Sequence, residues 1–216
     1  MKRLETIAQK LKPYHKIADI GCDHGYLIIE AFKISNDFEF IAIDNKKGPL
    51  NSCYKNISPY PYKNKVRFSL SSGIKDINDD TEVLVLAGMG GMLICDILKD
   101  DIKKTKRIIT CANRDNYNVR KYVTCLGFKI ISEEIVSENN KYYQIIVFDK
   151  CDEKYNLTEE ELTFGPLLMN EKKDIYISFL KNELETLNKI ENIHKSIEVE
   201  KKIEMIRSII KWIYKM

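Results

Sequence analysis

A glycine turn with an aspartate at its centre stands near the start of the chain, in the segment IADIGCDHGYL (17–27). Gly21 and Gly25 let the backbone turn tightly between an apolar run and a following helix. A dinucleotide-binding turn has a second glycine where this chain has Asp23, because a pyrophosphate approaches the backbone closely there. Asp23 would repel a pyrophosphate but suits a ligand with an ammonium or sulfonium group. The residues expected to hold such a ligand are Gly21, Cys22, Asp23, His24 and Gly25.

Two further acids are expected to belong to the same site as this turn. Asp44 ends the apolar run 38–44, about 20 residues after the turn, where nucleoside-binding sheets place an acid that accepts both ribose hydroxyls. We therefore expect Asp44 and its neighbour Asn45 to contact an adenosine. Asp19 either holds the ligand as well or anchors the turn through backbone amides. S-adenosylmethionine fits these expectations, since it carries an ammonium and a sulfonium group beside an adenosine.

A second glycine cluster, AGMGGML (87–93), follows another apolar run. Glycines at the carboxyl end of a strand bring the backbone close to whatever fills the crevice. Gly88, Met89 and Gly90 are therefore predicted to lie where two substrates meet; a flexible turn is the alternative. Many enzymes that methylate amines carry an Asn/Asp-Pro-Pro-aromatic stretch here, and this chain has none. The acceptor is not expected to be an exocyclic amine.

Short apolar runs predict the strands that must position these residues. Segments of helix length separate most of them, which predicts a parallel sheet with helical crossovers. The last two apolar runs, 128–137 and 141–149, are joined by only three residues, which predicts a β-hairpin. Five crossover strands followed by an antiparallel pair is the order of the seven-stranded sheet of Rossmann-like α/β methyltransferases. The crossover strands are expected at 16–21, 38–44, 65–70, 82–88 and 107–112, and the hairpin at 128–137 and 141–149.

The rest of the chain has the periodicity of helices. Ile177, Leu180, Leu184 and Leu187 follow a 3-4-3 spacing, as do Ile203, Ile206, Ile210 and Ile213. We expect two antiparallel helices that turn within 192–196, in a hairpin that buries its own apolar stripe; a partner-binding coiled coil is the alternative. The predicted domains are a methyltransferase domain over 1–150 and a C-terminal helical hairpin over 151–216.

Composition narrows the class of protein. The formal net charge of +3, from 35 basic and 32 acidic residues, permits contact with a polyanion without requiring it. Six scattered cysteines without a CxxC pair, and only three histidines, suggest neither a zinc site nor a disulfide framework. No apolar run approaches the ~18 residues of a membrane span. We expect a reduced, cytoplasmic protein that binds no metal and is a monomer.

The chain resembles the bacterial tRNA (adenine-22-N1)-methyltransferase family nearly from end to end. The motifs that carry the resemblance occur in the family's order: IADIGCDHGYL, Lys47-Gly48-Pro49, LAGMGGMLICDIL (86–98), Asn113, Arg120, NNKYYQIIVF and Gly165-Pro166. This chain reads Ser71-Ser72-Gly73-Ile74 where the family shows Gly-Asp-Gly-Leu after the third strand. It reads Cys111-Ala112-Asn113 where the family carries Gln-Pro-Asn, so only the asparagine matches.

The resemblance implies methyl transfer from S-adenosyl-L-methionine to N1 of an adenine in tRNA. Ser72 and Gly73 would lie beside the cofactor's adenine, and Asn113, with Met89 and Gly90, would position the acceptor base. N1 carries an in-plane lone pair, so transfer needs alignment and no general base, and the base must be extruded from its stack. Arg120 has a surface salt bridge as its alternative role. The residues expected to contact RNA are Lys2, Arg3, Lys10, Lys12, Lys47, Arg114 and Arg120.

Two other functions stay open from the sequence. A methyltransferase acting on a small metabolite or another RNA would share the cofactor site, and an RNA-binding adaptor without activity would keep only the fold. A dehydrogenase is disfavoured, because Asp23 replaces the second fingerprint glycine and Tyr26 the third.

Overall fold

The computed structural model describes residues 2–100, 102, 104–153, 155–170 and 174–215. The chain forms two compact units, Met1–Asn156 and Leu157–Met216. Each unit is described by itself.

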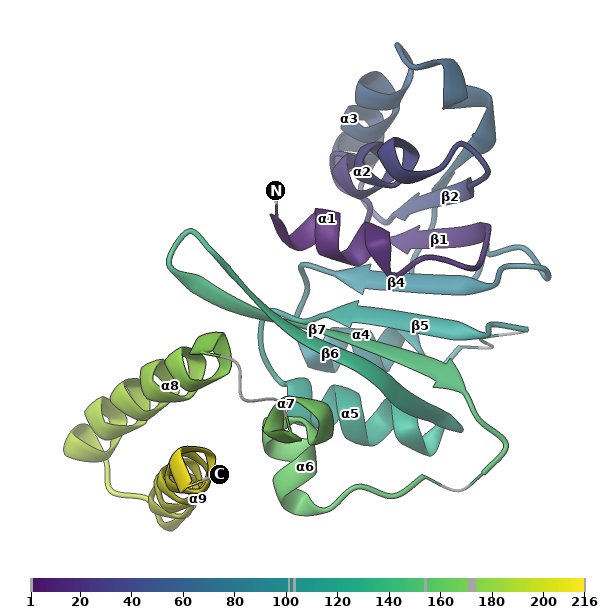
Figure 1. Ribbon diagram of the computed structural model, residues 1–216. Coiled ribbons are helices and arrows are strands. Elements are labelled where there is room, and N and C mark those ends of the chain that lie inside the picture. The colour runs from purple at the N-terminus through teal and green to yellow at the C-terminus, as the bar shows by residue number, and fades with distance from the viewer. Residues whose placement is uncertain (1, 101, 103, 154, 171–173, 216) are drawn as a thin grey trace. The chain divides into compact units, whose positions relative to one another are not determined.

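The first unit is built on one seven-stranded sheet with the order β3-β2-β1-β4-β5-β7-β6 (Figure 1). The first five strands are parallel, and β7 runs antiparallel to both of its neighbours. This topology confirms the prediction of a Rossmann-like methyltransferase sheet that ends in a hairpin. The strands are β1 (Lys16–Ile20), β2 (Glu39–Asp44), β3 (Val66–Leu70), β4 (Val83–Ala87), β5 (Arg107–Cys111), β6 (Phe128–Glu138) and β7 (Lys141–Lys150).

The strand order fixes where a ligand can lie. The crossover from β1 to β2 and that from β4 to β5 step in opposite directions along the sheet, so right-handed connections place their helices on opposite faces. A crevice therefore opens between the carboxyl ends of β1 and β4. The helices of this unit are α1 (Lys2–Gln9), α2 (Tyr26–Ile34), α3 (Lys47–Ile57), the 3-10 helix η1 (Pro61–Lys65), α4 (Gly91–Ile97) and α5 (Asn116–Cys125).

The central strands hold the turns at that crevice in place by burial. All five residues of β5 and the last four of β1 are buried, as are the first four of β4. Strands buried on both faces are typical of parallel sheets, and each apolar residue contributes about 1.5–3 kcal/mol when fully buried. Short loops that follow such strands are therefore anchored at one end in the buried core of the unit.

The second unit is helical, with α6 (Glu159–Phe164), α7 (Pro166–Asn170), α8 (Asp174–Ile193) and α9 (Ile197–Lys215). The long helices α8 and α9 break between Ile193 and Ile197, within the predicted turn. Leu180 and Leu187 of α8 are buried, and so are Ile203, Ile206, Ile209 and Ile213 of α9. Three predicted positions, Ile177, Leu184 and Ile210, are only half-buried, whereas Tyr176 and Ile209 beside them are buried. The spacing also did not separate the short helices α6 and α7 from the rest.

The first of these short helices begins with a capping box. The Thr158 hydroxyl accepts a hydrogen bond from the Glu161 amide at 3.2 Å, and the Glu161 carboxylate accepts one from the Thr158 amide at 2.7 Å. Thr158→Ala is expected to destabilise α6 by about 1 kcal/mol, because it removes the acceptor for an end-of-helix amide. Amide hydrogen exchange over 159–165 measures this. In the control Thr163→Ala, the lost hydroxyl donates to the Glu159 carbonyl within the helix and caps no end-of-helix amide, so exchange should not speed up.

Candidate active site

Four backbone amides of the glycine turn after β1 already donate hydrogen bonds within the protein. The amides of Gly21 and Cys22 donate to the Ile43 carbonyl at 2.8 and 3.0 Å, and the Gly25 amide donates to the Cys22 carbonyl at 2.7 Å. The Asp23 amide donates to the Asp44 carboxylate at 3.3 Å. These amides are therefore not available to a phosphate, in agreement with the expectation that the turn does not bind a pyrophosphate.

Three residues of the turn have left-handed backbone conformations. Gly21 and Gly25 have φ of 76° and 71°, and Asp23, at 48°, is a residue type that tolerates this region better than most. A Cβ atom on Gly25 would lie 2.6 Å from the Cys53 sulfur of α3, so packing as well as conformation requires glycine there. The exposed His24 ring stacks on Tyr26 at 5.4 Å, with Nε2 3.7 Å from the Asp23 carboxylate.

Asp44 anchors two loops at once. Besides the Asp23 amide, its buried carboxylate accepts a hydrogen bond from the Lys46 amide at 2.9 Å. A carboxylate has about four acceptor sites, so room for ribose hydroxyls remains. Asp44 therefore anchors the turn through backbone amides, which was the alternative role considered for Asp19. Asn45, the next residue, is exposed at the same edge.

Asp19 is a buried acid whose carboxylate has no hydrogen-bond partner in the described part of the chain. Only 5% of its surface is exposed. Burial, and to a lesser extent the carboxylates of Asp44 and Asp23, raises the pKa of Asp19 to about 7. No lysine or arginine among the described residues forms an ion pair with any of the three acids. Clustered acids without a cation are unfavourable unless a positively charged ligand joins them, which fits the expected ammonium and sulfonium groups.

Four hydrogen bonds tie the second glycine cluster to the end of β5 and the loop after it. The Gly88 amide donates to the Cys111 carbonyl at 3.0 Å, the Asn113 amide to the Met89 carbonyl at 2.9 Å, and the Gly91 amide to the Arg114 carbonyl at 3.0 Å. The Asn113 side-chain Nδ2 donates to the Gly88 carbonyl at 2.7 Å. This bond fixes the side-chain amide and leaves Oδ1 as an acceptor. A ligand amine could donate to it.

The two glycine loops approach each other across the crevice. A Cβ atom on Gly21 would lie 2.9 Å from the Met89 Cε, so the Met89 side chain lies on the first turn. A Cβ atom on Gly88, by contrast, would meet nothing within 4 Å. Gly88 therefore presents bare backbone to open space beside Asn113. The structure brings Asp19, the glycine turn, Asp44, Met89 and Asn113 to one edge of the sheet.

The residues predicted beside the cofactor's adenine lie in the loop after β3. Ser72 is exposed there, and Gly73 has a φ of 69°. A Cβ atom on Gly73 would lie 3.6 Å from side-chain atoms of both Ile97 and Asp100, so this glycine packs against the end of α4.

Asn56 of α3 is a residue of the site that the sequence did not indicate. Its side-chain Nδ2 donates to the His24 carbonyl at 3.0 Å and so gives the glycine turn a further anchor besides Asp44. Asn56 is 32 residues from His24 in the sequence, and no motif indicated that the two would be in contact.

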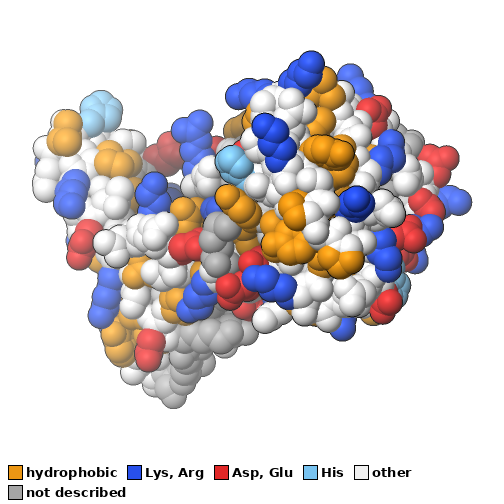
Figure 2. Space-filling view, turned by 90° about the horizontal axis from the view of Figure 1, so that it is seen from above, with side chains coloured by type: hydrophobic (Ala, Val, Ile, Leu, Met, Phe, Trp, Pro, Cys, Tyr) orange, Lys and Arg blue, Asp and Glu red, His pale blue; other side chains and the backbone are white. Residues whose placement is uncertain are grey.

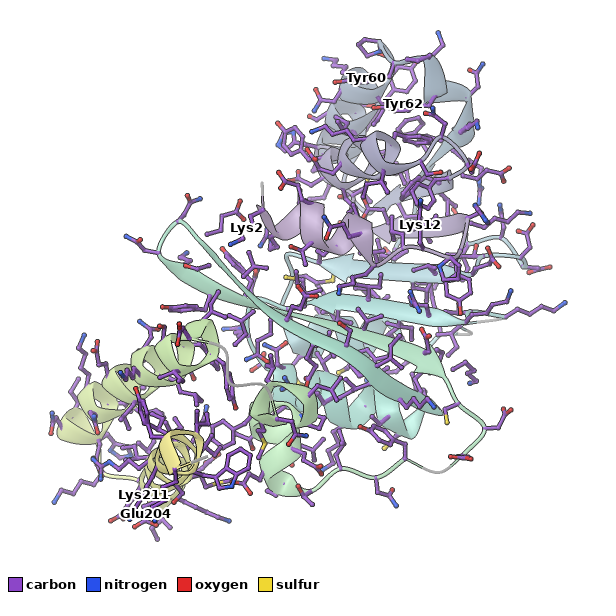
Figure 3. All side chains as sticks on the ribbon, in the orientation of Figure 1. Lys2, Lys12, Tyr60, Tyr62, Glu204 and Lys211 are labelled. Carbon is purple, nitrogen blue, oxygen red and sulfur yellow. The ribbon has the colours of Figure 1, made fainter. Side chains whose placement is uncertain are left out.

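Six of the seven basic residues predicted to contact RNA divide into three groups. Arg3 lies over the Tyr143 ring at 4.4 Å and 4.0 Å from the Glu138 carboxylate, and Lys10 pairs with Glu134. These two tie α1 to the β6–β7 hairpin. Lys2 and Lys12 are exposed and lie toward opposite ends of α1 (Figure 3), so they do not form one patch. Lys47 and Arg114 are exposed near the crevice, where the prediction placed them.

The prediction that Arg120 contacts RNA is wrong. Its side chain is fully buried, with Nε donating to Glu133 at 2.8 Å and Nη2 to Gln144 at 2.6 Å. Arg120 lies on the face of α5 that buries Val119 and Val123, and Glu133 and Gln144 meet it from β6 and β7. A buried, paired guanidinium cannot reach a phosphate, and the alternative of a surface salt bridge is replaced by a buried one.

The structure bears on metal binding and membrane spanning only for the residues that it describes. Among these residues, no group of three or more His, Cys, Asp or Glu side chains could hold a metal ion. No helix in the same part of the chain has the length and apolarity needed to cross a membrane.

Comparison with known proteins gives consistent matches. A Bacillus subtilis tRNA (adenine(22)-N(1))-methyltransferase is 26% identical over 217 residues, covering 96% of this chain and 91% of the relative. The structure of M. capricolum TrmK with S-adenosyl-homocysteine has a TM-score of 0.87 at 30% identity, covering 99% of this chain and 98% of that one. Streptococcus pneumoniae Sp1610 in complex with S-adenosyl-L-methionine has a TM-score of 0.89 at 28% identity, covering 97% and 99%.

The family model described as tRNA (adenine(22)-N(1))-methyltransferase matches residues 17–215. This match includes the glycine turn, the Gly88 to Gly91 cluster, Asn113 and the C-terminal helices. The chain belongs to the tRNA (adenine(22)-N(1))-methyltransferase family.

Proposed function

We propose that this protein transfers a methyl group from S-adenosyl-L-methionine to N1 of adenine 22 in tRNA. The observation that carries the proposal is the juxtaposition, at one sheet edge, of two features. One is a set of three acids that no lysine or arginine in the described part of the chain pairs with, and the other is the open backbone at Gly88 beside Asn113. The family membership and the cofactor-bound relatives support the same activity.

The acids and the glycine turn fit the cofactor by charge. When bound, S-adenosyl-L-methionine supplies an activated methyl group on a sulfonium. Asp19 and Asp23 would face its ammonium and sulfonium charges, and Asp44 and Asn45 its ribose hydroxyls. Gly21, Cys22, His24 and Gly25 would form the floor of the site, while Ser72 and Gly73 would lie at its adenine end.

Asn113 would orient the acceptor base. Its Oδ1 would accept a hydrogen bond from the adenine amine, because its Nδ2 is held by the Gly88 carbonyl. Methylation gives the adenine a positive charge and strengthens that hydrogen bond as the charge develops. Met89 and Gly90 would line the same crevice. Since N1 already has a lone pair, these residues act by positioning, which can lower the activation free energy by several kcal/mol.

Asn113→Ala is expected to lower kcat about ten- to thirtyfold, the equivalent of roughly 1.5–2 kcal/mol for one hydrogen bond to a charged group. Cofactor affinity should change little, because Asn113 faces the acceptor. Single-turnover methylation and calorimetric titration of the cofactor measure the two quantities. Asn113→Asp keeps an acceptor oxygen but loses the donor to Gly88, so it should recover part of the rate. Equal rates for the alanine variant and the wild type would exclude this role.

The acceptor base would be turned out of its stack to reach this crevice. Unstacking costs a few kcal/mol and less where the base is mismatched, so the RNA's structure around adenine 22 should matter. Lys2, Lys47 and Arg114 are exposed at or near this edge and would contact its phosphates. We further propose that the protein acts as a monomer in the cytoplasm, where its substrate is.

Transfer of labelled methyl to unmodified tRNA transcripts tests the proposal. Nuclease mapping should locate the label at N1 of adenine 22, and a transcript with guanine at that position should take up none. Label at another position, or cofactor binding without transfer to any tRNA, would contradict the proposed acceptor.

A further inference from the structure

The segment from Lys46 to Lys65, which contains α3 and η1, has an unusual charge pattern. It holds five lysines, three tyrosines and no aspartate or glutamate. Lys46, Lys47, Lys55, Lys63 and Lys65 are all exposed. The segment begins two residues after Asp44, at the cofactor edge, and continues along α3 to η1.

None of these five lysines is paired with a carboxylate among the residues that the structure describes. Lys65 donates to the Asn36 backbone carbonyl at 2.5 Å, which leaves its charge uncompensated. Three of the N-terminal basic residues differ, because Arg3, Lys10 and Lys16 lie against Glu138, Glu134 and Asp80. The free positive charge of the first unit is therefore concentrated on α3 and η1 more than on α1.

Part of this segment forms one exposed stripe. Lys47, Asn51, Tyr54 and Lys55 are exposed and follow the spacing i, i+4, i+7 and i+8, so they share a face of α3. In Figure 2, which looks onto the molecule from above, lysine or arginine side chains surround apolar ones over the region of α2 and α3. Tyr54, 58% exposed, contributes apolar surface to this stripe.

A row of three aromatic rings ends at this surface. Buried Phe32 stacks on Tyr62 at 3.9 Å, and Tyr62 stacks on Tyr60 at 5.0 Å, both with interplanar angles of 9° (Figure 3). Tyr60 is the outermost ring and is 40% exposed. It stands between Pro59 and Pro61, which restrict its backbone. A ring held this firmly loses little entropy when a flat ligand stacks on it.

We propose that the surface of α3 and η1 is a second contact for tRNA, with Lys55 and Lys63 on phosphates and an unpaired nucleobase stacked on Tyr60. This inference rests on the proposed function, since it assigns a further contact to the same substrate. Lysines without carboxylate partners favour a polyanion, and exposed aromatic rings beside them favour RNA that has unstacked bases. Lys47 connects this surface to the crevice where the acceptor base would lie.

The test compares tRNA binding by matched variants. Lys55→Ala/Lys63→Ala removes two unpaired charges, and the control Lys99→Ala/Lys106→Ala removes two that are paired with Asp96 and Glu82. Fluorescence anisotropy with unmodified tRNA at several KCl concentrations gives the slope of log K against log salt. The first variant should lower the magnitude of this slope by about 1.5, at ~0.7–0.9 per phosphate contact. The control should change it by less than about 0.5.

The stacking contact is tested by two variants of one residue. Tyr60→Ala should weaken tRNA binding about fivefold or more, whereas Tyr60→Phe, which keeps the ring, should stay within about twofold of the wild type. Unchanged calorimetric affinity for S-adenosylmethionine in each variant would show that the fold is intact.

Three results would count against the inference, in whole or in part. If the wild type methylates adenine 22 while every variant binds tRNA as the wild type does, the proposed function stands and this surface is not an RNA contact. Equal losses for Tyr60→Ala and Tyr60→Phe would overturn the stacking role specifically. A wild type that binds no tRNA would overturn both the proposed function and this inference.

Discussion

Gly91→Ala is expected to abolish most methyl transfer and to destabilise the protein by roughly 1–3 kcal/mol. A Cβ atom at Gly91 would lie 2.6 Å from the Asp115 carbonyl oxygen, 2.9 Å from the Arg114 carbonyl oxygen and 2.9 Å from Val119 Cγ2. Two of these atoms are backbone and cannot rotate away. The start of α4 must therefore move away from the loop after β5.

The loss of activity follows from the hydrogen bonds that cross this contact. The amides of Gly91 and Asn113, and the Asn113 side chain, all bridge the two loops. A shift of about 1 Å between Gly88 and Asn113 would misplace the acceptor base, and misplacement of this size can cost about a hundredfold in rate. Cofactor affinity should fall less, since Asp19 and Asp44 belong to other strands.

Two glycines serve as controls for this prediction. At Gly90 a Cβ atom would meet only the Arg114 Nε, at 3.8 Å, and at Gly48 it would meet nothing within 4 Å. Gly90→Ala and Gly48→Ala should each stay within about 0.5 kcal/mol of the wild type in urea unfolding. Gly48→Ala should also keep its turnover. If Gly91→Ala behaved like Gly48→Ala in both measurements, the close packing of the two loops would not be important for activity.

The sequence predicted the sheet and the crevice well for a physical reason. Strands buried on both faces are continuous apolar runs, so β1, β4 and β5 can be recognised from residue type alone. The turns that follow them need glycine or aspartate for left-handed conformations, so the positions of Gly21, Asp23 and Gly25 could be recognised in the same way.

Side-chain partners from distant parts of the chain could not be predicted. Arg120 looked like a surface cation, because nothing near it in sequence indicates that Glu133 and Gln144 will cover it. The same holds for Arg3 and Lys10, whose carboxylate partners stand more than 120 residues away on β6. A basic residue's position in the sequence shows its charge, but whether that charge remains free depends on long-range pairing.

Asp19→Asn is the second substitution with a large expected effect: it should weaken cofactor binding about thirtyfold or more. Removing one partner of a desolvated charge pair typically costs 2–5 kcal/mol or more. Asp23→Asn is the matched control, because asparagine also tolerates the left-handed backbone at this position. The Asp23 side chain is 67% exposed, so its loss should weaken binding less. Equal affinity losses for the two variants would argue against a special role for the buried acid.

The same acid should make cofactor binding depend on pH. Burial and the neighbouring carboxylates raise the pKa of Asp19 to about 7, so below that pH a cationic ligand must displace a proton to bind. Wild-type affinity should therefore rise about tenfold from pH 6 to pH 8. Titration calorimetry in buffers of different ionisation enthalpy should detect proton release below pH 7. Asp23→Asn should keep this dependence and Asp19→Asn should lose it; a wild-type affinity that is flat over this range would contradict the prediction.

Stability without the cofactor should change in the opposite sense. Because the folded-state pKa of Asp19 lies above its ordinary value of 3.8, the folded protein binds more protons than the unfolded chain between about pH 4 and pH 7. The contribution of Asp19 to the free energy of unfolding is therefore present below pH 4 and is lost as the pH rises to 7. Asparagine at position 19 cannot ionise, so the variant does not lose this stability as the pH rises. It should be more stable than the wild type at pH 8 by roughly 2–4 kcal/mol. Urea unfolding at pH 5 and pH 8 measures the difference, and a variant less stable than the wild type at pH 8 would show that the Asp19 carboxylate is stabilised in the fold without a ligand.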